Sequence, residues 1–129
     1  MIVDTSVVVA LAADEPSCAW IRKVLDEQAR ERLRMSWVNI AEAGMVLERA
    51  APGASMQLEA ALAALGVEPV EADFRLLQVA IVARSRFRLD FGDCFAYAHA
   101  LAGNEALITL DADFLRTDLP VVLHPKRRP

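Results

Sequence analysis

The chain has 129 residues, of which 55% are hydrophobic and 25% charged, and its formal net charge is −4. This length suits one domain with its own core, and the acidic balance argues mildly against a nucleic-acid binder that works through a basic surface. No segment reaches the roughly 18 continuous apolar residues of a membrane helix, and no basic stretch precedes an apolar one as in a signal peptide. We therefore expect a cytoplasmic protein without a membrane partner.

Cysteine content and mean hydropathy add two further expectations. Cys18 and Cys94 lie far apart without paired spacing, so the sequence indicates neither a zinc site nor a disulfide framework, and both are expected to be buried free thiols. The mean hydropathy of +0.28 leaves apolar surface that favours a dimer or a protein partner, although alanine-rich helices alone could produce the same value.

The first half of the chain is predicted to alternate strands with helices. Met1, Ile2 and Val3 form an apolar run typical of a strand buried on both faces, which ends at Asp4. Asn39 has the character of a helix cap after a second strand. In order, we predict a strand at 1–3, helices at 7–13 and from 16 to about 25, a strand at 33–37, and a helix from 39 to the Pro52-Gly53 break.

The second half continues the same alternation. Pro69 places the strand at 67–70 at or near a sheet edge. The other predicted elements are helices at 54–65, 73–86 and 93–102, strands at 106–110 and 121–123, and a helical turn at 112–115. This order predicts an α/β fold with a parallel sheet of four to five strands and helices on both faces. One domain is expected at 1–125, followed by a basic, disordered tail at 126–129.

Acidic residues recur where the predicted strands end. Asp4 ends the first strand, Glu42 lies one turn into the helix after the second, Asp93 opens the helix before the fourth, and Asp111 or Asp113 follows the fourth. In a parallel sheet these positions share the carboxyl edge, where open α/β sheets bind ligands. Because clustered carboxylates repel one another, a fold that gathers them is expected to hold a cation.

The predicted ligands are all oxygens, since neither His99 nor His124 falls among these positions. An oxygen-only site favours Mg²⁺ or Mn²⁺ over zinc. Such a site is well suited to hydrolysis of phosphodiester bonds, in which a metal activates water and stabilises charge on the phosphate.

Each acid also has a structural interpretation. Glu42 could complete a capping box with Asn39, Asp93 could favour a helix N-terminus, and Asp111 or Asp113 could cap the turn after the strand. A phosphotransfer protein would also carry an acid at position 4. That class needs a lysine after a later strand, and its haloacid-dehalogenase branch needs a second aspartate where Ser6 stands, so we consider it a poor match.

Four blocks around these acids resemble the signature motifs of PIN-domain proteins, and most of all the VapC toxins of bacterial toxin–antitoxin pairs. The blocks are Met-Ile-Val-Asp-Thr-Ser, Trp-Val-Asn-Ile-Ala-Glu, Leu-Asp-Phe-Gly-Asp-Cys-Phe-Ala-Tyr-Ala and Leu-Ile-Thr-Leu-Asp-Ala-Asp-Phe, in the expected order over nearly the whole chain. The resemblance implies a metal-dependent endoribonuclease, a homodimer, and a cognate antitoxin through which alone the toxin would meet DNA.

The resemblance also implies roles for individual residues. Asp4, Glu42 and Asp93 match the acids of the family's metal site, with Asp111 or Asp113 as the fourth. Thr5, Ser6 and Thr109 match hydroxyls that hold a carboxylate or a metal-bound water, although Ser6 could equally be an ordinary helix cap. A PIN-like module that has lost its activity, and a structure-specific DNA nuclease, are the alternative functions.

One departure from the family concerns the region before the Gly-Asp block. Family members often carry a longer loop containing Gly, His and Pro, whereas here 83–89 continues without it. Arg84, Arg86 and Arg88 occupy this region and could contact RNA phosphates, although a solvated charged face is the simpler interpretation. The aromatic side chains of Phe91, Phe95 and Tyr97 are expected in the core rather than stacked on bases.

Overall fold

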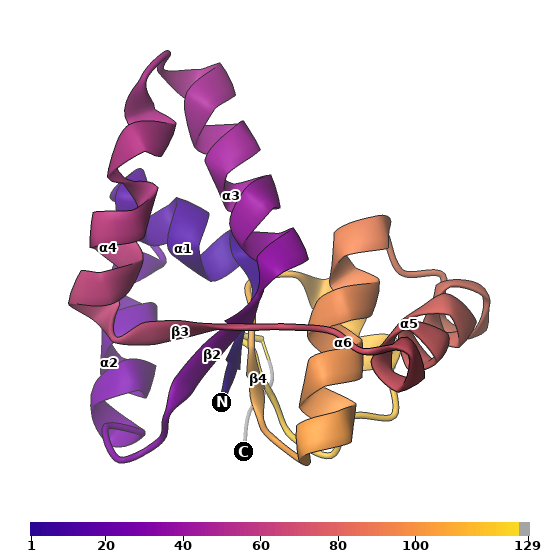
Figure 1. Ribbon diagram of the computed structural model, residues 1–129. Helices are drawn as coiled ribbons and strands as arrows, with labels where there is room; N and C mark the ends of the chain where they lie inside the picture. Colours follow the sequence, from indigo (N-terminus) through magenta and orange to yellow (C-terminus); the bar gives the residue numbers. More distant parts are fainter. Residues whose placement is uncertain (127–129) are drawn as a thin grey trace.

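A five-stranded parallel sheet forms the centre of the protein (Figure 1). The computed structural model describes residues 1–126. The strands lie in the order β3-β2-β1-β4-β5, so β1 is central and β3 is at an edge, as Pro69 predicted. Their bounds are β1 (Ile2–Val3), β2 (Leu33–Ser36), β3 (Val67–Val70), β4 (Leu107–Ile108) and β5 (Val122–Leu123). The predicted parallel α/β architecture is thus confirmed.

Helices cover both faces of this sheet (Figure 1). One layer holds α1 (Thr5–Ala12), α2 (Cys18–Glu27), α3 (Trp37–Ala50), the 3₁₀ turn η1 (Ala54–Gln57) and α4 (Leu58–Leu65); the chain then adds α5 (Phe74–Phe87), α6 (Phe91–Gly103) and the 3₁₀ turn η2 (Ala112–Arg116) on the other side. Because successive strand residues point to opposite faces, Ile2 packs in the core under α5 and α6, and Val3 packs in the core under α1 to α4. Both cores therefore meet at β1.

Several helices begin earlier than the sequence predicted. α1 begins at Thr5, directly after Asp4. α3 begins at Trp37, because Ser36 Oγ accepts the Val38 N–H at 3.1 Å and is the cap, so the assignment of Asn39 as the cap is wrong. α6 begins at Phe91, with Asp93 in its first turn.

The side chains follow the predicted burial with one exception. Tyr97 is buried, Phe95 packs against the core, and both cysteines are buried free thiols. Phe91, the first residue of α6, instead exposes 69% of its surface, so its placement in the core is wrong. Within 1–126, no helix combines the length and apolarity needed to cross a membrane. The predicted tail lies outside the described residues except for Lys126.

The connections from β1 and β4 place their following residues at one edge of the sheet. β1 pairs with β4 through Ile2 with Leu107 and Val3 with Ile108. Strand order reverses between these two neighbours, and ligands of open α/β sheets bind at such a reversal, beyond the carboxyl ends of the strands. Asp4 follows β1 and Asp111 lies shortly after β4, so both lie at this position.

Candidate metal centre

Asp4 is a buried carboxylate whose two oxygens have different surroundings. Oδ2 accepts hydrogen bonds from Ser6 Oγ at 2.7 Å and from Thr109 Oγ1 at 2.9 Å. Oδ1 is buried and has no hydrogen-bond partner. Burial raises the pKa of Asp4, although the bonds from Ser6 and Thr109 oppose this rise. A buried oxygen without a partner is costly unless a ligand satisfies it.

Glu42 is fixed between two helices by neutral donors. Its Oε1 accepts from Thr5 Oγ1 at 2.9 Å and from Asn39 Nδ2 at 2.9 Å. Asn39 Nδ2 also donates to the Gly92 carbonyl at 2.9 Å, which ties α3 to the first turn of α6. A Cβ on Gly92 would lie 2.0 Å from Glu42 Oε1, so only glycine leaves room for this carboxylate beside α6.

Asn39 and Gly92 are functional candidates that sequence reasoning missed. The signal was available, because Asn39 and Glu42 are three residues apart and therefore share a helix face. Asn39 was instead interpreted as a cap, with Glu42 as its capping-box partner in the structural alternative to the metal-site role. Since α3 begins at Trp37, Glu42 lies too far into the helix to be the third residue of a capping box.

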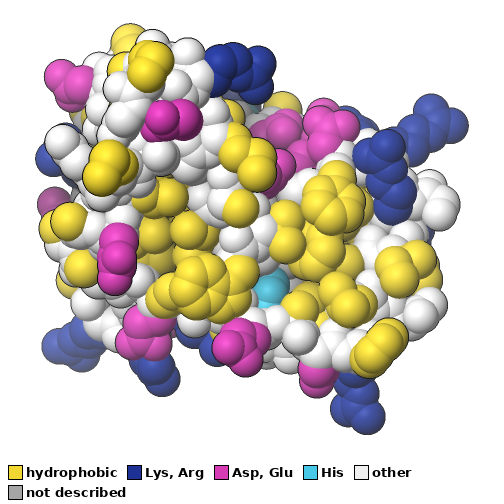
Figure 2. Space-filling model, turned by 45° about the horizontal axis from the view of Figure 1, so that its top comes forward, with side chains coloured by type: hydrophobic (Ala, Val, Ile, Leu, Met, Phe, Trp, Pro, Cys, Tyr) yellow, Lys and Arg dark blue, Asp and Glu magenta, His cyan; other side chains and the backbone are white. Residues whose placement is uncertain are grey.

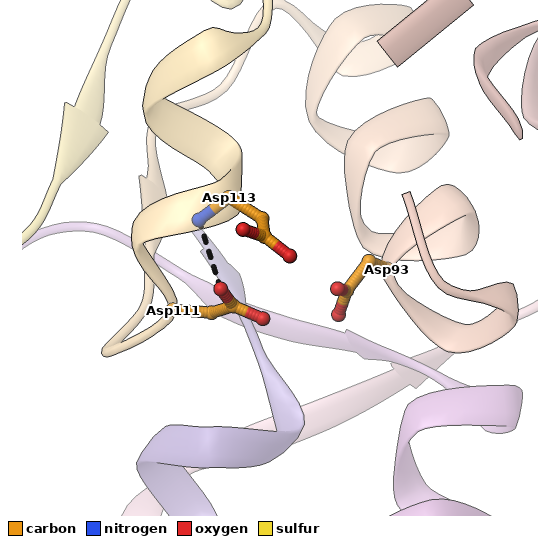
Figure 3. A group of neighbouring side chains, drawn as sticks. All are labelled: Asp93, Asp111 and Asp113. Atoms are coloured by element: carbon orange, nitrogen blue, oxygen red, sulfur yellow. Dashed lines mark hydrogen bonds between the residues drawn. The ribbon is translucent and has the colours of Figure 1, made fainter. Parts of the chain in front are cut away.

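Asp93, Asp111 and Asp113 point toward one another from two elements (Figure 3). One oxygen from each lies within 4.8 Å of the others. Asp111 Oδ1 accepts the Asp113 N–H at 2.8 Å, so Asp111 caps η2 while it also belongs to the cluster. Both aspartates that the sequence left as alternatives are therefore present together.

The acids act on one another electrostatically. Burial and then the charges of Asp4 and Asp111 raise the pKa of Asp93 to about 8, and Glu42 adds to this effect. Within the described chain, the one ion pair that reaches these acids joins Arg116 to Asp113 at 2.6 Å on the surface. Figure 2 shows acidic side chains gathered in the upper middle of this face, beside an apolar area. The cluster therefore carries negative charge that the protein itself compensates only at its rim.

Two of the three arginines that were predicted to contact RNA have partners within the protein. Arg84 donates to the Leu89 carbonyl, and Arg86 lies 3.3 Å from Asp118. α5 ends before Arg88, which takes a left-handed conformation with φ of 55°. Contact of these three side chains with RNA stays a prediction.

Comparison with known proteins places this arrangement in a family. The model of the PIN domain matches residues 1–119. The chain belongs to the PIN-domain family. Among its relatives, Ribonuclease VapC of Mycolicibacterium smegmatis is 30% identical over 131 residues, covering 95% of this chain and 99% of the relative. Ribonuclease VapC30 of Mycobacterium tuberculosis is 30% identical over 97% of this chain and 100% of the relative.

Two solved structures share the fold. VapC20 of Mycobacterium tuberculosis, described as a toxin that cleaves the sarcin-ricin loop, aligns with a TM-score of 0.75 at 18% identity, over 92% of this chain and 95% of its own. VapBC2 of Rickettsia felis, solved with a fragment of promoter DNA, aligns with a TM-score of 0.75 at 16% identity, over 95% and 96%. At this identity the likeness concerns the fold alone.

Proposed function

We propose that this PIN-domain protein is a metal-dependent endoribonuclease that hydrolyses RNA phosphodiester bonds as the toxin of a toxin–antitoxin pair. The observation that carries the proposal is the convergence of carboxylates from β1, α3, α6 and η2 on one edge of the sheet. Relatives named Ribonuclease VapC, which match nearly the full length at 30% identity, support RNA as the substrate class.

A divalent cation fits the residues present. Asp4 offers a buried oxygen without a partner, Asp93 lies among carboxylates that raise its pKa, and every donor is an oxygen. These features suit Mg²⁺ or Mn²⁺, and Asp4, Glu42, Asp93 and Asp111 would hold the ion. We assign the fourth position to Asp111 because its charge acts on both Asp4 and Asp93, whereas Asp113 is paired with Arg116.

The remaining polar residues hold these ligands in place. A bound cation would polarise the attacking water and stabilise negative charge on the phosphate. Thr5 and Asn39 fix Glu42 through two hydrogen bonds to Oε1. Ser6 and Thr109 both donate to Oδ2 of Asp4 and leave its Oδ1 for a ligand. Asp93 holds a proton at neutral pH in the absence of a cation and must release it to act as a ligand.

We further propose a cognate antitoxin, a homodimer and a cytoplasmic location, where RNA is available. The solved Rickettsia felis relative is a VapBC complex on promoter DNA, which supports an antitoxin partner and only indirect contact of this chain with DNA. Exposed apolar side chains on several helices, among them Met45, Met56, Ile81 and Phe91, offer surface for protein partners.

The direct test incubates the purified chain with a panel of structured RNAs and the matching DNA sequences, with Mn²⁺ and with a chelator. We expect cleavage of RNA with Mn²⁺ and none with the chelator. Equal cleavage of DNA would favour a structure-specific DNA nuclease. Failure to cut any substrate by folded protein that still binds Mn²⁺ would favour an inactive interaction module.

A further inference from the structure

His124 is a buried histidine at the end of β5 whose two ring nitrogens both have backbone partners. It exposes 5% of its surface. Nδ1 lies 3.0 Å from the Lys126 nitrogen, and Nε2 lies 3.1 Å from the Leu110 carbonyl oxygen. The Lys126 N–H can only donate and the Leu110 carbonyl can only accept. The neutral ring must therefore carry its proton on Nε2 and donate it to Leu110.

The hydrogen bond from His124 to the Leu110 carbonyl lies just beyond the end of the backbone hydrogen bonds between β4 and β5. Leu107 donates to the Val121 carbonyl and Thr109 donates to the Leu123 carbonyl. If the register of β4 and β5 continued, the next backbone N–H to donate from the segment after β5 to the segment after β4 would be that of residue 125. This residue is Pro125, which has no N–H. Within residues 1–126, the ring of His124 thus supplies the hydrogen bond between the β4 and β5 segments that follows the bond from Thr109 to Leu123.

The segment that His124 reaches carries an acid of the proposed metal centre. The Leu110 N–H donates to Ser6 Oγ at 3.0 Å, and the Asp111 N–H donates to Thr109 Oγ1 at 2.9 Å. Ser6 and Thr109 are the same hydroxyls that donate to Asp4. The peptide between Leu110 and Asp111 is therefore bonded through its N–H to Thr109, which is itself bonded to Asp4, and through its carbonyl to His124.

We propose that His124 is a positioning residue for Asp111, which it orients through the Leu110 carbonyl. The inference rests on the proposed metal-dependent function. Without this bond the Leu110–Asp111 peptide loses its restraint on the β5 side, and Asp111 is held less well for a divalent cation. Residues that orient ligands typically change metal affinity by about 10- to 100-fold when they are removed.

The test measures Mn²⁺ affinity of the full chain by calorimetry for wild type, His124→Leu, His124→Gln and His99→Leu. His99 is the matched control, since it is the other histidine, is also buried, and lies six residues further along α6 than Asp93, near Arg34 and Glu105. We expect about tenfold weaker binding for His124→Leu. His124→Gln, whose amide N–H can still reach Leu110, should recover most of the affinity, and His99→Leu should bind as wild type.

A metal-free measurement checks the same geometry. Nitrogen-correlated NMR of the imidazole groups should show the Nε2–H tautomer for His124. If His124→Leu does not fold, His124→Asn replaces it, because the Asn carbonyl can still accept from Lys126 while its amide N–H is too short to reach Leu110. Wild-type affinity in His124→Leu or His124→Asn, or an equal loss in His99→Leu, would overturn the inference alone. Absence of Mn²⁺ binding by the wild type would overturn it together with the proposed function.

Discussion

The two ends of the parallel sheet hold charge in opposite ways. At the amino end, Glu105 lies 2.9 Å from the Met1 ammonium through Oε2 and 2.8 Å from the Arg34 guanidinium through Oε1. Each of its oxygens therefore faces a cation. At the carboxyl end, Asp4 and Asp93 face other carboxylates, and Asp4 Oδ1 has no hydrogen-bond partner.

This difference distinguishes an acid that stabilises the fold from acids that are arranged to bind a ligand. An acid that is paired with cations stabilises the fold that pairs it, so Glu105 is explained by its neighbours. Acids that raise one another's pKa destabilise the folded chain when no counter-ion is bound. The carboxyl end is therefore where we propose that a cation binds, and substitutions at the two ends should have opposite consequences.

The largest expected effect is on catalysis at the carboxyl end. Asp93→Asn should lower RNA cleavage by about two to three orders of magnitude, because the proposed centre loses a ligand that stabilises charge in the reaction. Single-turnover cleavage of an RNA that the wild type cuts would measure it. Asp90→Asn is the matched control. Asp90 is exposed, lies one turn away, and occupies the N-cap position of α6 without a side-chain capping hydrogen bond, so asparagine can replace it there. Wild-type cleavage by Asp93→Asn would remove Asp93 from the centre.

The same substitution should stabilise the protein when metal is absent. The pKa of Asp93 is about 8, above its usual value of 3.8, so the folded chain keeps a proton that the unfolded chain has released. The free energy of unfolding should then fall as pH rises from about 4 to about 8. Asp93→Asn should make this slope shallower, although the raised pKa of Asp4 keeps part of it, and should gain about 2 kcal/mol at pH 8 after allowance for solvent screening.

Urea unfolding in chelator at several pH values would measure this gain. Asp90→Asn, outside the cluster, should stay within about 0.5 kcal/mol of the wild type. The contrast between the two ends would be contradicted if the metal-free wild type became more stable between pH 5 and pH 8 and Asp93→Asn showed the same free energy of unfolding as the wild type.

At the amino end the corresponding neutralisation should destabilise. Glu105→Gln removes the partner of both Arg34 and the Met1 ammonium, at a partly buried position, and should cost about 1–2 kcal/mol. Glu68→Gln is the control, because Glu68 pairs with Arg32 where both side chains are exposed, and such pairs contribute about 0.5 kcal/mol. Equal losses in the two variants would show that Glu105 is an ordinary surface charge.

Much of the carboxyl end could be predicted from the sequence. Asp4 and Asp111 follow apolar runs typical of buried strands, and parallel strands bring their carboxyl ends to one edge. The position of β3 at an edge of the sheet could be predicted from Pro69 alone. These features depend on local pattern, which the sequence displays directly.

The rest depends on contacts between distant segments. Ser36 and Asn39 are both good helix caps, so only the structure shows that Ser36 caps α3 and that Asn39 holds Glu42 and Gly92. The ion pairs of Glu105 join residues that are far apart in the chain, and no spacing in the sequence predicts them. The same holds for the hydrogen bond from His124 to Leu110.

The smallest expected effect concerns His99, which belongs to the compensated end. Burial, and then the nearby charge of Arg34, lowers the pKa of His99 below its usual 6.5. Below pH 6.5 the His99 ring therefore binds a proton in the unfolded chain more readily than in the folded chain. As a result, the contribution of His99 to the free energy of unfolding is highest above pH 6.5 and falls as pH decreases below that value. His99→Gln should reduce this loss between pH 7 and pH 5.5 by about 0.5–1 kcal/mol. The measurement is best made in the Asp93→Asn background, because Asp93 contributes a slope of the opposite sign. If His99→Gln left the pH dependence of the free energy of unfolding unchanged, His99 would be charged in the folded protein. The amino end would then contain one more positive charge than its acidic side chains neutralise.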